Sequence, residues 1–243
     1  GVKLFPLAWL GAPLLSRRWR LLLTGVVATL LVLSVGFLVM PEANRYYWFE
    51  SLPHRLTSAS NRAGMDDQSL IAWLDRFLRP QTYRVPGLQV HDFVDVTWQP
   101  PWNVSAGVIR RVGYVLSALL ALPVVYLIIK APSVAVEGGV YLWILYLTAV
   151  FPHMERYNHA LLLPALAWLW AARRYRMVAA GYALVGLSRL NHLWIMLLPS
   201  PWGPLASGFG LYAVVLLGVG LGQELWRTRA TARRESGQWI TTS

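Results

Sequence analysis

The chain has 243 residues, of which 56% are hydrophobic and only 14% are charged. Soluble domains average about 25% charged residues, so the composition excludes an ordinary soluble protein and indicates a membrane protein. There is no cysteine, which excludes disulfides and thiolate metal sites. The formal net charge of +11 comes from Lys and Arg that border apolar runs, so nucleic-acid binding is not predicted.

The chain starts at Gly1 rather than Met, and Lys3 is followed at once by apolar sequence. No charged region with a cleavage site can be assigned there, so a signal peptide is not predicted. We expect the chain to be part of a longer one.

Apolar runs long enough to cross a bilayer recur along the chain. A membrane helix needs about 20 residues to cross roughly 30 Å of hydrocarbon. The runs that meet this length are Leu21–Met40, Val112–Ile129, Val134–Phe151 and Pro204–Leu221. Shorter runs are Leu4–Leu15, Ala160–Ala172 and Met177–Leu198, which suit helices that are broken or buried by neighbours. The predicted fold class is therefore all-α, a polytopic transmembrane helical bundle of about seven spans or partial spans.

Basic residues follow every second run. They are Arg17, Arg18 and Arg20, then Lys130, then Arg173, Arg174 and Arg176, and finally Arg227, Arg229, Arg233 and Arg234. Short basic connections face the cytoplasm by the positive-inside rule. The alternate connections then face outward, and with them the long loop at 41–108.

This pattern predicts four parts of the chain. They are 1–40 with the first two membrane helices, 41–108 as an extracytoplasmic loop, 109–226 as a helical bundle, and 227–243 as a basic cytoplasmic tail. Most of the acidic residues lie in the loop: Glu42, Glu50, Asp66, Asp67, Asp75, Asp92 and Asp95. A helix is predicted over Asp67–Leu78, with its apolar face on the membrane and Asp66 or Asp67 as its N-cap. Tyr83–Trp102 is expected to be irregular or weakly extended.

The first candidate site is Asp66-Asp67-Gln68-Ser69. Two adjacent carboxylates could supply a base or hold a cation. An Asp at a helix start more often serves as a cap, and both interpretations stay open.

The second candidate is the stretch from His153 to His159, which also holds Glu155, Arg156 and Tyr157. Glu155 and His159 are spaced to share a helical face, as are His153 and Arg156. Arginine suits phosphate, because its planar fork donates two hydrogen bonds at once. The alternative is a headgroup-level connection with snorkelling side chains.

The third candidate is Arg189, Asn191 and His192, which interrupt Met177–Leu198. Ionisable residues at membrane depth indicate function, provided that the residues do lie at depth.

Other chemistry has no support in the sequence. Gly218, Gly220 and Gly222 end an apolar run with no strand before them, so helix packing is favoured over nucleotide binding. No His pair has zinc-ligand spacing, and Ser69 lacks the strand–turn–helix context of a nucleophile. Neither a metal nor a cofactor is predicted. An outward-facing enzyme without a nucleotide motif needs a membrane-borne substrate, and a polyprenyl-phosphate sugar fits.

These residues resemble glycosyltransferase family eighty-seven, multispan C-type enzymes that include mycobacterial polyprenol-phosphate-mannose-dependent mannosyltransferases. Val2-Lys3-Leu4-Phe5-Pro6 with Arg17-Arg18-Trp19-Arg20 is similar to the family's Lys-x-x-Pro helix and basic turn. Asp67-Gln68-Ser69-Leu70, followed by Arg76, resembles its Asn-Gln-Ser-Leu…Arg segment. Tyr157-Asn158-His159 before Leu161-Leu162-Leu163-Pro164 resembles its aromatic–His stretch.

The resemblance implies an inverting hexosyltransferase of the cell envelope, integral to a bacterial plasma membrane with its active face extracytoplasmic. The donor would be a polyprenyl-phosphate sugar, such as mannose, and the acceptor a lipid or glycan. Asp67 stands where the family has Asn. The family's proposed catalytic Asp lies in an earlier outer loop, so we expect the base outside this chain.

The interpretation places Arg156, His159 and His153 around the phosphate or sugar, with Glu155, Tyr157, Arg76, Arg189 and His192 also in the substrate-binding set. Asp66, Asp67 and Gln68 would organise the loop over the site. A transporter or flippase, a non-catalytic scaffold, and a family member without activity remain alternatives.

Overall fold

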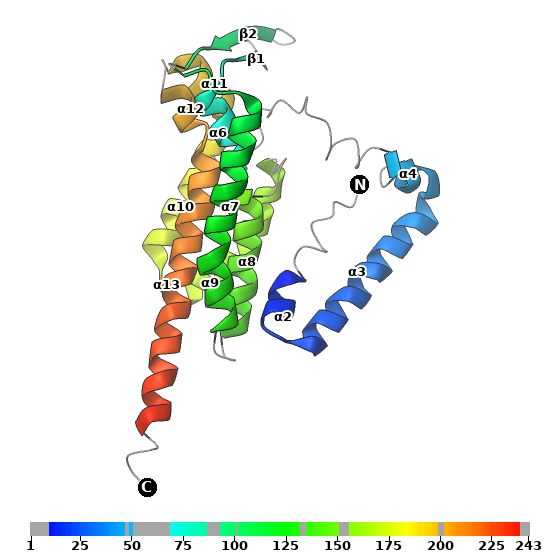
Figure 1. The fold of residues 1–243 in the computed structure, drawn as a ribbon, viewed down its shortest axis with the longest axis vertical. Coiled ribbons are helices and arrows are strands. Elements are labelled where there is room, and N and C mark those ends of the chain that lie inside the picture. The colour runs from blue at the N-terminus through cyan, green and yellow to red at the C-terminus, as the bar shows by residue number, and fades with distance from the viewer. Residues whose placement is uncertain are drawn as a thin grey trace. The chain divides into compact units, whose positions relative to one another are not determined.

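The computed structural model describes residues 10–46, 49–50, 69–86, 93–100, 102–131, 135–150, 156–198 and 202–238. The chain divides into two compact units, Gly1–Arg62 and Ala63–Ser243. The division falls inside the predicted loop at 41–108. Each unit is built on apolar helices (Figure 1).

The first unit contains α2 (Gly11–Leu15), α3 (Trp19–Val39) and α4 (Pro41–Tyr46). Large apolar side chains cover α3, and those of Leu23, Leu31 and Leu38 are all more than half exposed. Thr24, Thr29 and Ser34 each donate a hydrogen bond to the carbonyl four residues earlier. Because their hydroxyls are satisfied within the helix, α3 presents an apolar surface suited to lipid.

The second unit contains the remaining elements. They are α6 (Leu70–Leu78), β1 (Gln81–Pro86), β2 (Phe93–Trp98), α7 (Ala106–Ile129), α8 (Val136–Val150), η3 (Arg156–Leu162), α9 (Leu163–Ala171), α10 (Tyr175–Ser188), α11 (Asn191–Leu197), α12 (Trp202–Ala206) and α13 (Phe209–Gln238). Helix α13 packs against α10, α8, α9 and α7, so it is the central helix of this bundle. The core holds Leu145 of α8, Leu169 of α9 and Leu217 of α13, all with 1% exposure or less.

Three described helices are long and apolar enough to cross a membrane: Trp19–Val39, Ala106–Ile129 and Phe209–Ala232. Helix α8 and the stretch His159–Ala171 are shorter apolar helices. The all-α membrane bundle predicted from the sequence is confirmed. The prediction for Pro204–Leu221 was wrong at its start, because α12 ends at Ala206 and α13 begins at Phe209.

The interrupted run Met177–Leu198 is two helices, α10 and α11, as expected of a broken segment. Helix α10 ends at Ser188 with Arg189 as its C-cap, and α11 starts at Asn191. Fourteen residues span about 21 Å, which is less than the hydrocarbon core. The C-terminal end of α10 therefore lies at the same end of the bundle as α11 and α12 (Figure 1).

The predicted loop helix exists but is shorter and more buried than predicted. Its N-cap is Ser69, whose Oγ accepts a hydrogen bond from the Ala72 amide, and not Asp66 or Asp67. Arg76, near the end of this helix, is fully buried. The helix packs against α7, α8 and α12, so it belongs to the bundle instead of lying on the membrane face.

A β-hairpin follows α6, in a segment expected to be irregular or weakly extended. Strands β1 and β2 pair antiparallel, with Gln81 opposite Trp98 and Thr82 opposite Thr97. The two threonine hydroxyls lie 3.3 Å apart and share a hydrogen bond, as cross-strand threonines often do.

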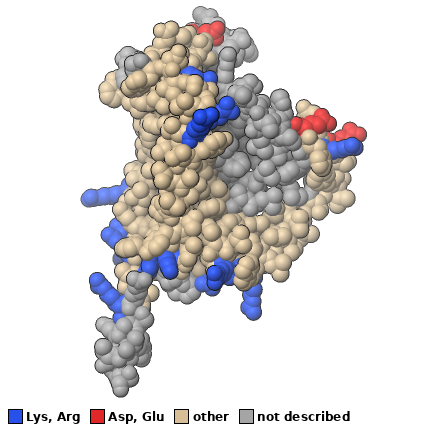
Figure 2. Space-filling view, in the orientation of Figure 1, with Lys and Arg blue, Asp and Glu red and all other residues tan. Residues whose placement is uncertain are grey.

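Exposed cations lie at both ends of the second unit, and more of the described ones lie at one end. We call one the basic end, where α7 stops and α10 starts; its exposed cations include Lys130, Arg173, Arg176, Arg227 and Arg234. The other, the α6 end, is where α7 and α13 begin and α8 stops. Figure 2 shows Lys and Arg toward both ends. At the α6 end, Arg110 and Arg111 are exposed near the start of α7.

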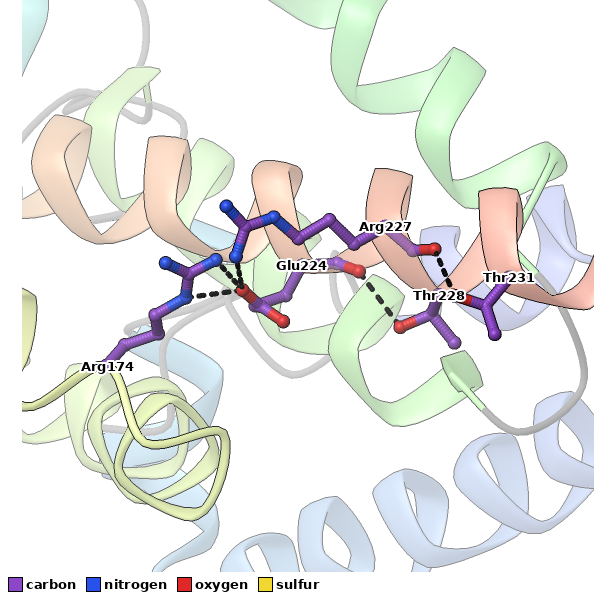
Figure 3. A network of polar contacts seen from close by, with 5 residues as sticks. All are labelled: Arg174, Glu224, Arg227, Thr228 and Thr231. Carbon is purple, nitrogen blue, oxygen red and sulfur yellow. Dashed lines mark hydrogen bonds and ion pairs between the residues drawn. The ribbon is translucent and has the colours of Figure 1, made fainter.

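At the basic end, Glu224 of α13 joins two arginines (Figure 3). Arg174, beside the start of α10, donates to Glu224 through Nε and also forms an ion pair with it. Arg227, one turn along α13, approaches the same oxygen at 3.3 Å. The Glu224 side chain is 16% exposed, so this cluster ties the α9–α10 turn to the central helix from a half-buried position.

The turn before α10 has the same backbone geometry as the turn before α3. In each turn, two backbone amides donate to carbonyls of the preceding helix, as in a Schellman motif. Before α10, the amides of Arg173 and Arg174 donate to the carbonyls of Trp170 and Leu169. Before α3, the amides of Arg17 and Arg18 donate to the carbonyls of Leu14 and Pro13. The first arginine of each is left-handed, with φ of 58° at Arg173 and 54° at Arg17. The sequences, Arg-Arg-Trp-Arg and Arg-Arg-Tyr-Arg, match as well. Both units therefore reverse direction through the same basic turn.

Candidate functional site

The α6 end holds a buried polar cluster, which we call the Arg76 cluster: Trp73, Arg76, Ser207 and Tyr212. Trp73 and Arg76 lie on α6, Ser207 lies in the turn before α13, and Tyr212 lies in the first turn of α13. Arg76 and Ser207 are both 0% exposed. Burying an arginine carries a large desolvation cost, so hydrogen-bonding partners are required there.

Hydrogen bonds run through the cluster in two branches. Arg76 Nε donates to Ser207 Oγ at 3.1 Å, and Ser207 Oγ donates to the Pro204 carbonyl at 2.7 Å. Trp73 Nε1 donates to the Tyr212 hydroxyl at 3.1 Å, and that hydroxyl donates to the Leu205 carbonyl at 2.9 Å. Both branches end on α12, so α6 is held against the α12–α13 turn.

Close packing at Gly208 completes this contact. A Cβ at Gly208 would lie 2.6 Å from Trp73 Nε1 and 2.9 Å from Tyr212 Cζ, below any normal contact distance. Glycine is therefore required where the backbone passes between the two rings. Because Gly208 has no side chain, Trp73 can reach the Tyr212 hydroxyl.

Aromatic rings extend from the cluster in both directions. Trp73 stacks on Phe77 with centroids 5.6 Å apart and planes within 2°, and Phe77 contacts Trp102 at 5.5 Å. On the other side, Tyr212 contacts Phe209 at 6.1 Å and Phe209 contacts Trp194 at 5.9 Å. These ring contacts connect α6, α11 and α13, and Trp102, at one end of the series, is half exposed.

The carboxylate on α6 has a local role. Asp75 is 7% exposed and pairs with Arg79 at 2.9 Å, and Gln81 donates to it as well. The pair links the end of α6 to the first residue of β1. Asp75 therefore fixes the position of the first residue of β1 relative to α6.

The other predicted residues are placed as follows. Asp66, Asp67, Gln68, His153 and Glu155 lie outside the described residues, and the side chains of Arg156, Tyr157 and His192 do too. His159 lies on η3 and is 4% exposed, Asn191 is 0% exposed, and Arg189 is exposed. Residues 156–162 form a 3₁₀ helix, while His153 and Glu155, one member of each predicted pair, lie outside the described residues.

Helices α6 and η3 share a packing partner, α8. Both pack against α8, and η3 follows the end of α8 closely in the chain. Ile71 of α6 touches Gly113, in the first half of α7, which places α6 beside the start of α7. No group of three or more His, Cys, Asp or Glu able to hold a metal occurs among the residues that the structure describes.

Sequence reasoning missed Trp73, Ser207 and Tyr212. One signal was available, since Ser207-Gly208 and Tyr212 interrupt an apolar run in which polar groups need partners. The partner, Arg76, is far away in sequence, so the pairing itself could not be read from the chain.

The family model for glycosyltransferase family 87 matches residues 1–133. The chain belongs to glycosyltransferase family 87. This membership makes it a membrane glycosyltransferase, with a sugar donor and an acceptor as its substrates. No match was found among curated proteins or among solved structures. The matched region includes α6 with Trp73 and Arg76, whereas Ser207 and Tyr212 lie beyond it.

Proposed function

We propose that this glycosyltransferase transfers a sugar, mannose in the first instance, from a polyprenyl-phosphate donor to a lipid or glycan acceptor on the extracytoplasmic side of a bacterial plasma membrane. The observation that carries the proposal is the family match over 1–133, which includes the segment Asp67–Arg76. A polyprenyl tail partitions into lipid, so a bundle of apolar helices gives the donor direct access from the bilayer.

The proposed chemistry is one displacement with inversion. A base takes the proton of the acceptor hydroxyl, whose oxygen attacks the anomeric carbon. The bond from that carbon to the phosphate oxygen breaks, and polyprenyl phosphate leaves with the electron pair. Positive side chains stabilise the charge that develops on the leaving phosphate.

We assign the donor shell to the α6 end. Arg156, His159 and His153 are the proposed contacts to phosphate or sugar, with Glu155 and Tyr157 beside them in the chain. Arg189 at the end of α10 and His192 on α11 are proposed to complete the set. Asp66, Asp67 and Gln68 are proposed to organise the loop over the site. Full burial of Arg76 supports a positioning role, in which its bond to Ser207 fixes the helix that follows this loop.

Support for the orientation comes from charge. The connection after α7 carries Lys130, and the connection between α9 and α10 carries Arg173 and Arg174, with Arg176 just inside α10. Short basic connections favour the cytoplasmic side. The α6 end would then face outward.

The test is sugar transfer from polyprenyl-phosphate mannose by the full-length enzyme, with its catalytic base, in membranes. We expect Arg156→Ala and His159→Ala each to lower the rate about 100-fold, as the loss of an oxyanion-stabilising donor does. Arg176→Ala, at the basic end, is the control and should keep the rate. Unchanged transfer in folded Arg156→Ala and His159→Ala variants would show that the site is assigned wrongly.

A further inference from the structure

An apolar groove runs between α7, α8 and α13 at the depth of their apolar segments. Its volume is about 250 Å³, and its lining includes Leu120, Val124 and Leu142 with Gly218 and Gly222 of α13. Tyr146 also lines it, but its hydroxyl donates to the Ser117 carbonyl at 3.2 Å. The groove therefore offers an occupant apolar surface almost throughout.

Two of the residues that line this groove, Gly218 and Gly222, have no side chain to fill it. A Cβ at Gly218 would have Leu142 as its nearest neighbour at 4.0 Å, and one at Gly222 would lie 3.3 Å from Leu127. A methyl group at Gly218 would therefore meet its nearest neighbour only at ordinary contact distance. The groove beside Gly218 is therefore open to a ligand.

A cation stands beyond the groove on the same face of α13. Arg229 is seven positions after Gly222, which is two helical turns and hence the same side. Its NH1 donates to the Tyr126 hydroxyl at 2.8 Å, and its guanidinium lies over the rings of Tyr126 at 5.3 Å and Trp226 at 5.6 Å. Arg229 therefore reaches from α13 to α7 and is held in position at the basic end.

The fixed guanidinium still has capacity for an anion. Arginine has five N–H donors, and the bond to Tyr126 uses one of them. Lys130 lies one turn beyond Tyr126 and is exposed, which adds a second positive charge. From Gly218 to Arg229 the helix rises only about 16 Å, within the length of one lipid tail.

We propose that this groove binds one anionic phospholipid of the basic-end leaflet, with an acyl chain against Gly218 and Gly222 and the phosphate on Arg229. Charge complementarity selects the occupant, because an apolar groove with a guanidinium about 10 Å beyond its last lining glycine matches a tail that ends at a phosphate. The inference rests on the bundle alone and is independent of the sugar donor proposed above.

The test is native mass spectrometry of the full chain released from detergent with added phosphatidylglycerol or phosphatidylcholine of the same acyl composition. We expect one phosphatidylglycerol per chain, and at least about 10-fold weaker retention of phosphatidylcholine. Arg229→Gln should lower phosphatidylglycerol retention about 10-fold, and Gly218→Leu should abolish it by filling the groove. A large excess of glycerol phosphate should not displace the lipid, because it lacks the tail.

Two matched controls separate the site from general effects on folding or charge. Gly186→Leu places the same side chain on α10, where nothing lies within 4 Å of the added Cβ. Arg176→Gln removes an exposed basic-end charge away from the groove. Both should retain phosphatidylglycerol.

Three results would overturn the proposal. One is equal retention of the two phospholipids, and another is unchanged retention in Gly218→Leu. The third is displacement of phosphatidylglycerol by polyprenyl phosphate together with loss of sugar transfer in Arg229→Gln, which would make the groove part of the donor site.

Discussion

Arg76 on α6 and Ser207 in the turn before α13 are 131 positions apart in the sequence, and a hydrogen bond of 3.1 Å joins them. The bond connects the region matched by the family model to the C-terminal part of the bundle. Both side chains are fully buried, so water cannot replace either partner. We therefore expect this contact to be one of the more costly to break at the α6 end.

Ser207→Ala should lower the free energy of unfolding by about 1–3 kcal/mol, because it leaves the buried Arg76 Nε without its serine acceptor. Ser188→Ala is a matched control. Ser188 is also 0% exposed and also donates to a carbonyl three residues earlier, at 2.7 Å. Its loss should cost about 1 kcal/mol or less. Thermal unfolding in detergent measures both, and equal losses would show that the Arg76 bond contributes nothing.

Ser69→Ala should destabilise the protein by about 0.5–2 kcal/mol, since it removes the cap of α6. Ser69 Oγ accepts from the Ala72 amide at 3.3 Å in a site that is 1% exposed. Ser105 caps α7 in the same way at 3.4 Å, but it is exposed, so water can replace it. Ser105→Ala should therefore cost less. A larger loss for Ser105→Ala than for Ser69→Ala contradicts this account.

Glu224→Gln should lower stability by about 1–3 kcal/mol, because it leaves Arg174 and Arg227 facing each other without their shared carboxylate (Figure 3). Arg227→Gln removes only the outer partner, whose side chain is 63% exposed, and should cost under about 0.5 kcal/mol. Melting temperatures of the two variants give the comparison. If Arg227→Gln is the more damaging, the ion pair with Arg174 is not the main contact.

Arg173→Gly should stabilise the protein by up to about 1 kcal/mol, because φ of 58° at this position is strained for any residue but glycine. Arg173 is exposed, so little contact is lost. Arg176→Gly, inside α10, should instead destabilise by about 1 kcal/mol. Unfolding in detergent distinguishes them by sign. A destabilised Arg173→Gly would mean that the side chain makes contacts worth more than the backbone strain.

The membrane helices could be predicted from the sequence because length and apolarity alone decide them. Leu21–Met40 corresponds to α3 and Val112–Ile129 to α7, each within a few residues except at the start of α7, where Arg110 and Arg111 lie inside the helix. A charge-free run marks the hydrocarbon-spanning part, whereas the helix continues through capping by Ser105. Length and apolarity therefore identified the spans, and capping set their ends.

The packing of α6 could not be predicted in the same way. Its apolar stripe indicated a helix lying on a surface, but Arg76 and Asp75 are buried by α12 and by the hairpin strand that follows. A polar residue looks solvent-facing until its partner is known, and Ser207 is distant in sequence. Long-range hydrogen bonds leave no periodic signal in the chain.

The donor is the point on which the account depends most. The decisive measurement is the initial rate of sugar transfer by the full-length enzyme in membranes, with mannose presented either on polyprenyl phosphate or on a nucleotide. We expect transfer from polyprenyl-phosphate mannose, and none above background from the nucleotide sugar, because the proposed site receives its donor from the bilayer. Transfer from the nucleotide sugar with none from the lipid-linked sugar would contradict the proposed function.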